Sequence, residues 1–168
     1  MRTSNTKVLL VMVATLIVAF AFGQAGEDSW FDAENCDFCV TLSADPTLLE
    51  NTTWEHHDID GGIISVSTVA ESHLASFNEA MDAMKIVGEK MEKGETVKMC
   101  NMCTSMGGLM MKGAKYESVQ TKHGSVGLMT SADPEITKMI QEWGAKTMKE
   151  LAMAEEAEAK TGHEGHDH

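Results

Sequence analysis

The chain has 168 residues, with 26 acidic and 13 basic side chains and a formal charge of −13. This acidity excludes a protein that binds nucleic acid through a basic surface, because backbone phosphates need neighbouring cations. Hydrophobic residues make up 43% of the chain, which is enough for the packed core of one small domain. Methionine occurs 14 times and aromatic residues make up only 5%, so flexible thioether side chains supply much of the apolar volume.

The N-terminus has the pattern of a secretory signal over residues 1–25. An apolar run of fifteen residues, Val8 to Phe22, follows Arg2 and Lys7 and precedes several small residues. The run is shorter than the roughly 20 residues that span a bilayer, which favours a cleaved signal peptide over a membrane anchor. We therefore predict a secreted or periplasmic protein that makes no membrane contact once the signal is removed.

Two C-x-x-C pairs organise the remaining chain. Cys36/Cys39 and Cys100/Cys103 are 64 residues apart, and the segments that follow them match at an offset of 62. The shared order of cysteine pair, hairpin and helix predicts an internal duplication. The predicted layout is a first repeat over 26–93 and a second over 94–154, together one domain, then a flexible acidic His-rich tail over 155–168.

Each repeat contains the pattern of a β-hairpin. Asp60-Gly61-Gly62 and His123-Gly124 are tight-turn signals between segments of alternating polarity. Ile64 and Val66 alternate with Ser65 and Ser67, which suits a sheet with one buried face. Because an isolated hairpin cannot bury its apolar face, the two hairpins are predicted to join in one sheet.

A helix is predicted after each hairpin. The first begins near Glu71, and the second is capped by Asp133 with Pro134 at its first position and extends to about Lys160. The predicted fold class is α+β: internally duplicated helix-hairpin-helix units that form a four-stranded antiparallel sheet with helices on one face.

The cysteines are the main candidates for chemistry, and their state is open. In an exported protein each pair could close as a disulfide, or the duplication could bring the two pairs together. Four converging thiolates would make a tetrahedral site for zinc or Cu(I). Metal binding is slightly favoured, and its predicted inner ligands are Cys36, Cys39, Cys100 and Cys103.

Methionine and histidine supply further soft or borderline donors. Met99 and Met102 are interleaved with the second cysteine pair, where thioethers could assist Cu(I) binding or simply fill the core. The chain ends with His163, His166 and His168 among acidic residues. Such a tract is predicted to capture metal ions loosely.

The stretch from Thr96 to Lys146 partly resembles the start of a heavy-metal-associated domain. The shared features are a predicted strand, the pair Cys100/Cys103, a helix, a hairpin and a helix. That family has a Met one residue removed from the first Cys and ends on a strand, whereas here Met99 abuts Cys100 and a long helix follows. The resemblance implies metal binding through the cysteine pair.

The sequence therefore predicts a non-catalytic, exported protein that binds copper, or else zinc, for sequestration or delivery. The signatures of thioredoxin-type enzymes, serine hydrolases, zinc proteases and phosphate loops do not occur in it. Two alternatives remain open: a secreted structural or interaction module with C-x-x-C disulfides, and a thiol-disulfide oxidoreductase. The predicted partners are metal ions, with no nucleic acid.

Overall fold

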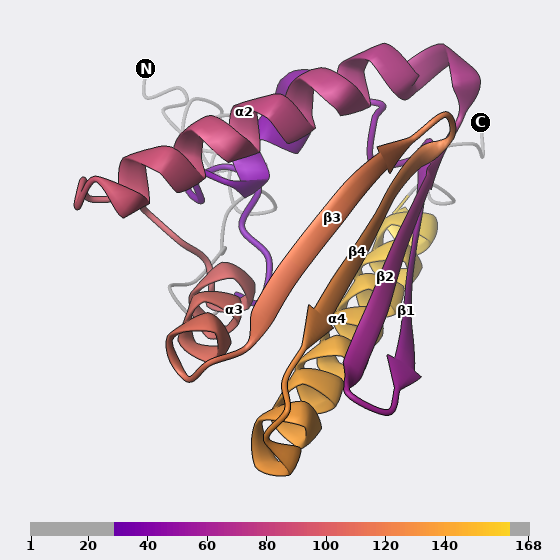
Figure 1. Cartoon of the computed structure of the whole chain (residues 1–168). Coiled ribbons are helices and arrows are strands. Elements are labelled where there is room, and N and C mark those ends of the chain that lie inside the picture. The colour runs from indigo at the N-terminus through magenta and orange to yellow at the C-terminus, as the bar shows by residue number, and fades with distance from the viewer. Residues whose placement is uncertain (1–28, 162–168) are drawn as a thin grey trace, which may run out of the picture.

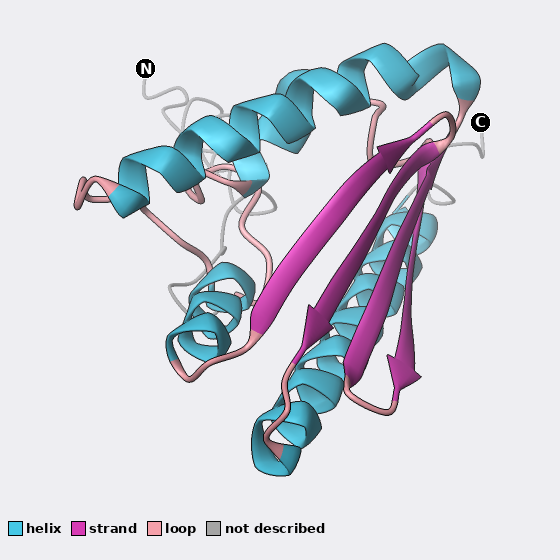
Figure 2. Ribbon diagram, viewed as in Figure 1, coloured by secondary structure: helices cyan, strands magenta, loops and turns pink. Residues whose placement is uncertain are grey.

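The computed structural model describes residues 29–161 of the chain (Figures 1 and 2). The predicted signal peptide lies outside the described residues. The elements, in chain order, are η2 (Cys39–Ala44), β1 (Thr52–Ile59), β2 (Gly62–Val69), η3 (Glu71–His73), α2 (Leu74–Glu92), α3 (Asn101–Met111), β3 (Lys115–Thr121), β4 (Gly124–Thr130) and α4 (Pro134–Thr161).

The strands form one antiparallel sheet in the order β1-β2-β4-β3. β1 and β2 form one hairpin, β3 and β4 form the other, and the two hairpins join through β2 and β4 at the centre of the sheet. The prediction of an α+β fold with a four-stranded antiparallel sheet is therefore confirmed. α4 begins as predicted, because the Asp133 carboxylate accepts hydrogen bonds from the backbone N–H groups of Glu135 at 2.8 Å and Ile136 at 3.3 Å.

The central strand pairing reproduces the sequence offset of 62. Gly62 pairs with Thr130 and Thr68 pairs with Gly124, so exchanging the two hairpins leaves the register unchanged. The prediction that both halves of the chain are the same helix-hairpin-helix unit is not confirmed. The element ahead of the first hairpin is the six-residue 3-10 helix η2, whereas the element ahead of the second is the eleven-residue α-helix α3.

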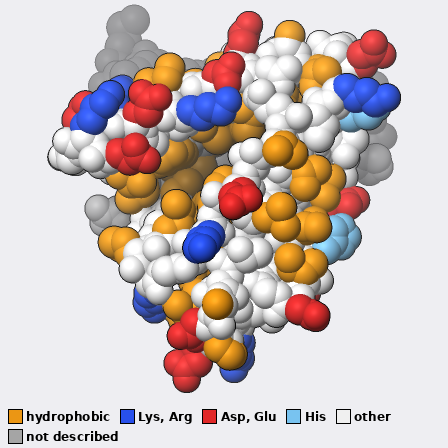
Figure 3. All heavy atoms as spheres, viewed as in Figure 1, with side chains coloured by type: hydrophobic (Ala, Val, Ile, Leu, Met, Phe, Trp, Pro, Cys, Tyr) orange, Lys and Arg blue, Asp and Glu red, His pale blue; other side chains and the backbone are white. Residues whose placement is uncertain are grey.

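α2 and α4 pack on the same face of the sheet. This face presents Ile63 to α4 and Val69 to α2, whereas Ile64 and Val66 belong to the opposite face. No described element covers that face, and hydrophobic side chains gather over the strands in Figure 3. The alternation of Ile64 and Val66 with serines therefore predicts the strand correctly. The two apolar residues lie on the open face of the sheet, and the serines lie on the covered face, where they leave room for the large side chains of the helices.

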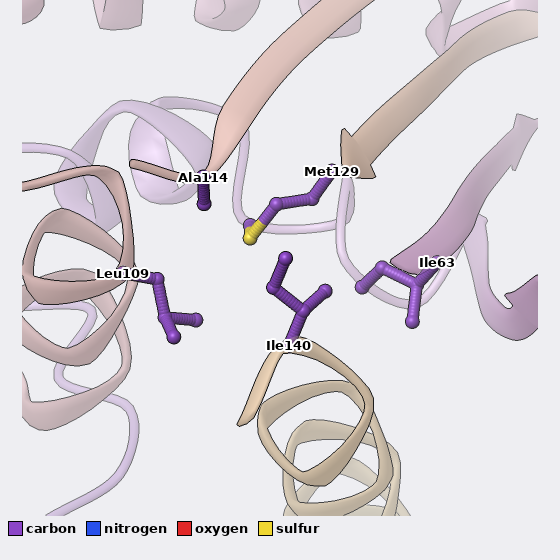
Figure 4. Packing of buried hydrophobic residues seen from close by; sticks show 5 residues of the cluster. All are labelled: Ile63, Leu109, Ala114, Met129 and Ile140. Atoms are coloured by element: carbon purple, nitrogen blue, oxygen red, sulfur yellow. The ribbon is translucent and has the colours of Figure 1, made fainter. Parts of the chain in front are cut away.

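The larger core cluster joins α3, α4 and the sheet (Figure 4). Ile140 of α4 is fully buried between sheet residues Ile63 and Met129, and Leu109 of α3 closes the cluster together with Ala114. This packing fixes α3, and with it the second cysteine pair, relative to α4. A second cluster places Phe77 of α2 against Val69 and Leu48, so it connects the N-terminal segment to α2.

His56 lies between the sheet and α4. Its ring stacks on Trp143, with centroids 5.4 Å apart, and its Nδ1 lies 3.4 Å from the carbonyl oxygen of Gly144. Burial lowers the pKa of His56, because a charged imidazolium would lose its hydration there. The nearby charge of His57 lowers this pKa further. The folded protein therefore favours the neutral ring.

Acid is expected to destabilise the protein through His56. Between its lowered folded pKa and its ordinary unfolded value, only the unfolded chain binds the proton, so stability is lost as pH falls through this interval. His56→Phe keeps the stack on Trp143 and removes the proton site. Urea unfolding at about pH 8 and about pH 5 should show a smaller acid-induced loss for the variant than for the wild type. Equal losses in the two proteins would contradict this role.

Candidate metal centre

The first cysteine pair lies in a short segment folded by Asp32. The Asp32 carboxylate accepts hydrogen bonds from the backbone N–H groups of Asn35 at 2.8 Å and Glu34 at 3.1 Å. The first of these bonds is the main reason that the pKa of Asp32 is lowered. The turn places Cys36 just ahead of η2, and Cys39 begins that helix. Both side chains are buried.

The second pair lies at the start of α3. Cys100 is the N-cap residue in an extended conformation, and Cys103 belongs to the first turn. Residues 95–100 have no regular secondary structure, so the strand that the heavy-metal-associated pattern placed ahead of Cys100 is missing. A helix N-terminus favours thiolates, because its free N–H groups and dipole stabilise negative charge.

Hydrogen bonds from three backbone N–H groups hold the two segments together. The N–H of Asp37 donates to the carbonyl oxygen of Lys98 at 2.9 Å, and the N–H of Lys98 donates to the Asp37 carboxylate at 2.9 Å. The N–H of Met102 donates to the carbonyl oxygen of Trp30 at 3.0 Å. These contacts bring the four cysteines to one place although the pairs are 64 residues apart in sequence.

The four sulfur atoms all lie within 4.8 Å of one another. Cys36 and Cys103 are 3.7 Å apart, Cys39 and Cys100 are 3.7 Å apart, and Cys39 and Cys103 are 3.9 Å apart. All four side chains are free thiols, and three are at least nine-tenths buried while Cys103 is partly exposed. Of the two alternatives that the sequence left open, the structure shows the convergence of the pairs, and no disulfide is formed among them.

The cysteines of the cluster differ in pKa. The pKa of Cys39 is lowered to about 6, chiefly because Cys103 donates a hydrogen bond to its sulfur. The pKa of Cys103 is raised for the same reason, and burial adds to this effect. Burial also raises the pKa of Cys100, although the N–H of Cys103 partly offsets it. The cluster thus favours the thiolate of Cys39 over those of Cys100 and Cys103, and a metal ion would have to displace the protons of these two thiols.

The other predicted ligands differ in position. Met102 packs against the cysteine cluster, whereas Met99 is 38% exposed. Their roles as ligands stay predictions. His163, His166 and His168 lie outside the described residues.

Two tryptophans support the cluster and were missed by the sequence-based prediction. The Nε1–H of Trp143 donates to the carbonyl oxygen of Met102 at 3.2 Å. The Nε1–H of Trp30 donates to the hydroxyl of Thr147 at 3.3 Å, and the ammonium of Lys146 lies 3.9 Å from the centroid of the Trp30 ring. α4 therefore anchors both segments that carry the cysteines. Only the rarity of tryptophan in this chain could have drawn attention to these positions.

Asp37 is the other missed residue. It lies between Cys36 and Cys39, where its contacts with Lys98 fix the distance between the two cysteine pairs. Its position inside a C-x-x-C pair was the available signal, but the distant backbone partner could not be read from the sequence.

Within residues 29–161, none of the helices combines the length and apolar character needed to cross a bilayer. Comparison with protein-family models, curated proteins and solved structures finds no match to this chain. The four-cysteine cluster is therefore the feature of this chain that points to a function.

Proposed function

We propose that this is an exported protein that binds one thiophilic metal ion through Cys36, Cys39, Cys100 and Cys103. The observation that carries the proposal is the spacing of the sulfur atoms. Tetrahedral coordination with metal–sulfur bonds of about 2.3 Å requires sulfurs about 3.8 Å apart. Three of the sulfur–sulfur distances are 3.7, 3.7 and 3.9 Å, so an ion could enter with little movement of the side chains.

Zinc is the ion that this donor set favours. Four thiolates in tetrahedral geometry are typical of closed zinc sites, and the burial of the cysteines matches a site that holds its ion. Cu(I) is the second candidate, because the Met102 side chain packs against the cluster and could add a thioether. We place the protein's action in metal binding rather than catalysis.

Sequestration is the physiological role that fits the whole chain. The predicted signal peptide would export the protein, and its acidic composition attracts cations. The predicted tail ligands His163, His166 and His168 would gather ions loosely, while the cysteine cluster would retain one. Delivery to a partner is less favoured, because three of the four thiols are buried.

A competition titration tests the proposal. The reduced full chain should take up one zinc ion against a chromogenic chelator, with a binding free energy of about 10 kcal/mol or more. Replacing all four cysteines with serine should abolish this tight site. A chain truncated after Thr161 lacks the histidine cluster and should keep it. Unchanged affinity in the cysteine-free variant would overturn the proposal, and parallel titration with Cu(I) compares the two ions.

Asp37 is expected to act as a positioning residue for this site. Asp37→Ala removes the acceptor for the Lys98 N–H, so the two cysteine pairs should be held less rigidly and zinc affinity should fall about tenfold. Asp37→Asn should lose less, because its amide oxygen can still accept the bond. The same titration measures these variants, with Asp58→Ala on the exposed part of β1 as a control for lost charge. Equal affinities for Asp37→Ala and Asp58→Ala would contradict this role.

A further inference from the structure

Three sulfur–sulfur contacts have hydrogen-bonding geometry, and all three cross between the two C-x-x-C pairs. The sulfur of Cys36 is 3.7 Å from that of Cys103, and the sulfur of Cys39 is 3.7 Å from that of Cys100. These contacts share no residue, so both can become covalent in the same molecule. The sequence alone does not favour these crossed disulfides, because the nearest cysteine along the chain is always the other member of the same C-x-x-C pair.

We propose that the cluster is a redox-controlled site in which oxidation forms the disulfides Cys36–Cys103 and Cys39–Cys100 and expels the metal ion. The co-reactant is a small-molecule disulfide, such as oxidised glutathione. For each protein disulfide, two cysteine thiolates give up two electrons, and the S–S bond of the oxidant breaks to yield two thiolates. Two oxidant molecules therefore convert four metal-bound thiolates into two disulfides, and the ion leaves with its charge unchanged.

Cys103 is the entry point for the oxidant. As a ligand of the proposed metal ion, Cys103 would be bound as a thiolate, and thiol-disulfide exchange requires an accessible thiolate. It is the one cysteine of the cluster that is not buried. Its attack on the oxidant forms a mixed disulfide and releases the first thiolate. Cys36, 3.7 Å away and 1% exposed, then attacks the Cys103 sulfur and releases the second thiolate. The loss of these two ligands opens the metal site, after which Cys39 and Cys100 react in the same manner.

The backbone already holds the two segments in the geometry that these disulfides need. The contacts between Asp37 and Lys98 and between Trp30 and Met102 do not involve the sulfur atoms. Each sulfur pair must close from 3.7 Å to about 2.05 Å. The oxidised protein should therefore keep the fold of the metal-bound form, and a thiol reductant should restore metal binding.

Peptide mapping of the oxidised full chain tests the pairing. Trypsin cleavage after Lys98 and Lys112 puts Cys100 and Cys103 on one peptide, while Cys36 and Cys39 lie on another that ends at Lys85. Crossed disulfides link these two peptides, and fragmentation of the linked species should show Cys36 joined to Cys103. Two separate peptides, each with an internal ring, would overturn the proposal.

Paired variants give the matched rate comparison. Cys39→Ser with Cys100→Ser retains the crossed pair, and Cys36→Ser with Cys39→Ser retains the local pair of α3. The crossed pair should oxidise at least several-fold faster with oxidised glutathione. Equal or reversed rates would contradict the assigned geometry.

Because metal release rests on the proposed zinc site, the zinc-loaded chain is tested separately. A chromogenic chelator should report complete release of zinc on oxidation and renewed uptake after reduction. If zinc binds but the map shows local rings, the pairing fails and the zinc site stands. If crossed disulfides form but the reduced chain binds no zinc, the zinc site and its redox release fail and the pairing stands.

Discussion

Removing zinc from the loaded protein is expected to lower its free energy of unfolding by about 4 kcal/mol, for free zinc about a thousandfold above the dissociation constant. The physical reason is that the ion would bind only the folded chain. Cys36 and Cys39 lie in the N-terminal segment and the other two thiols at the start of α3, so the unfolded chain does not bring them together. Thermal unfolding of the reduced chain, with zinc and after exhaustive chelation, measures the difference.

Amide hydrogen exchange shows which part of the chain loses stability when zinc is removed. Chelation should release protection first in residues 29–44 and in the first turn of α3, while the paired strands of the sheet keep theirs. The variant with serine at all four cysteine positions should unfold at the same temperature with and without zinc. A chelator effect that persists in this variant would assign the stabilisation to another part of the chain.

Alanine at either Gly62 or Gly124 is expected to cost about 3 kcal/mol or more, because both positions combine backbone strain with a steric clash. Each glycine starts a central strand with a positive φ, 153° for Gly62 and 137° for Gly124. A Cβ at Gly62 would lie 1.9 Å from the carbonyl oxygen of Met129, and one at Gly124 would lie 2.0 Å from that of Ser67. The clash falls on the β2–β4 pairing that joins the hairpins.

Helical glycines provide the control for this prediction. A Cβ at Gly88 or Gly107 would meet nothing within 4 Å, so alanine there should leave stability unchanged or raise it by up to about 1 kcal/mol. Urea unfolding of the four variants under the same metal conditions makes the comparison. Similar stabilities for the strand and helix variants would show that the sheet can shift its register or relax its turns.

Local sequence patterns predicted the elements of the fold well. The turn residues around Gly62 and Gly124 and the Asp133-Pro134 cap act over a few residues, so their effect does not depend on distant parts of the chain. The covered face of the sheet could not be predicted in this way. Ile63 and Ile64 are both apolar, and the packing of α4 decides which of them becomes the core residue.

The sequence predicted the four cysteines of the candidate site, but it did not predict the residues that hold them in place. Soft sulfur donors at C-x-x-C spacing identified the four cysteines, because spacing of three residues allows both thiols to face one ion. Asp37 and Trp143 gave no comparable signal, since their partners are backbone groups of Lys98 and Met102. Every residue has such groups, so no side-chain pattern marks them.

The sequence by itself determined the strands, the turns, the helix start at Pro134 and the identity of the four thiols, because these follow from local conformational preference and side-chain chemistry. Only the tertiary structure decided that the cysteine pairs meet, with Cys36 lying 3.7 Å from Cys103 and Cys39 lying 3.7 Å from Cys100. The reason is distance along the chain: Cys36 and Cys103 are 67 residues apart. Their approach depends on the core around Ile140 and on the backbone contacts of Asp37 and Trp30.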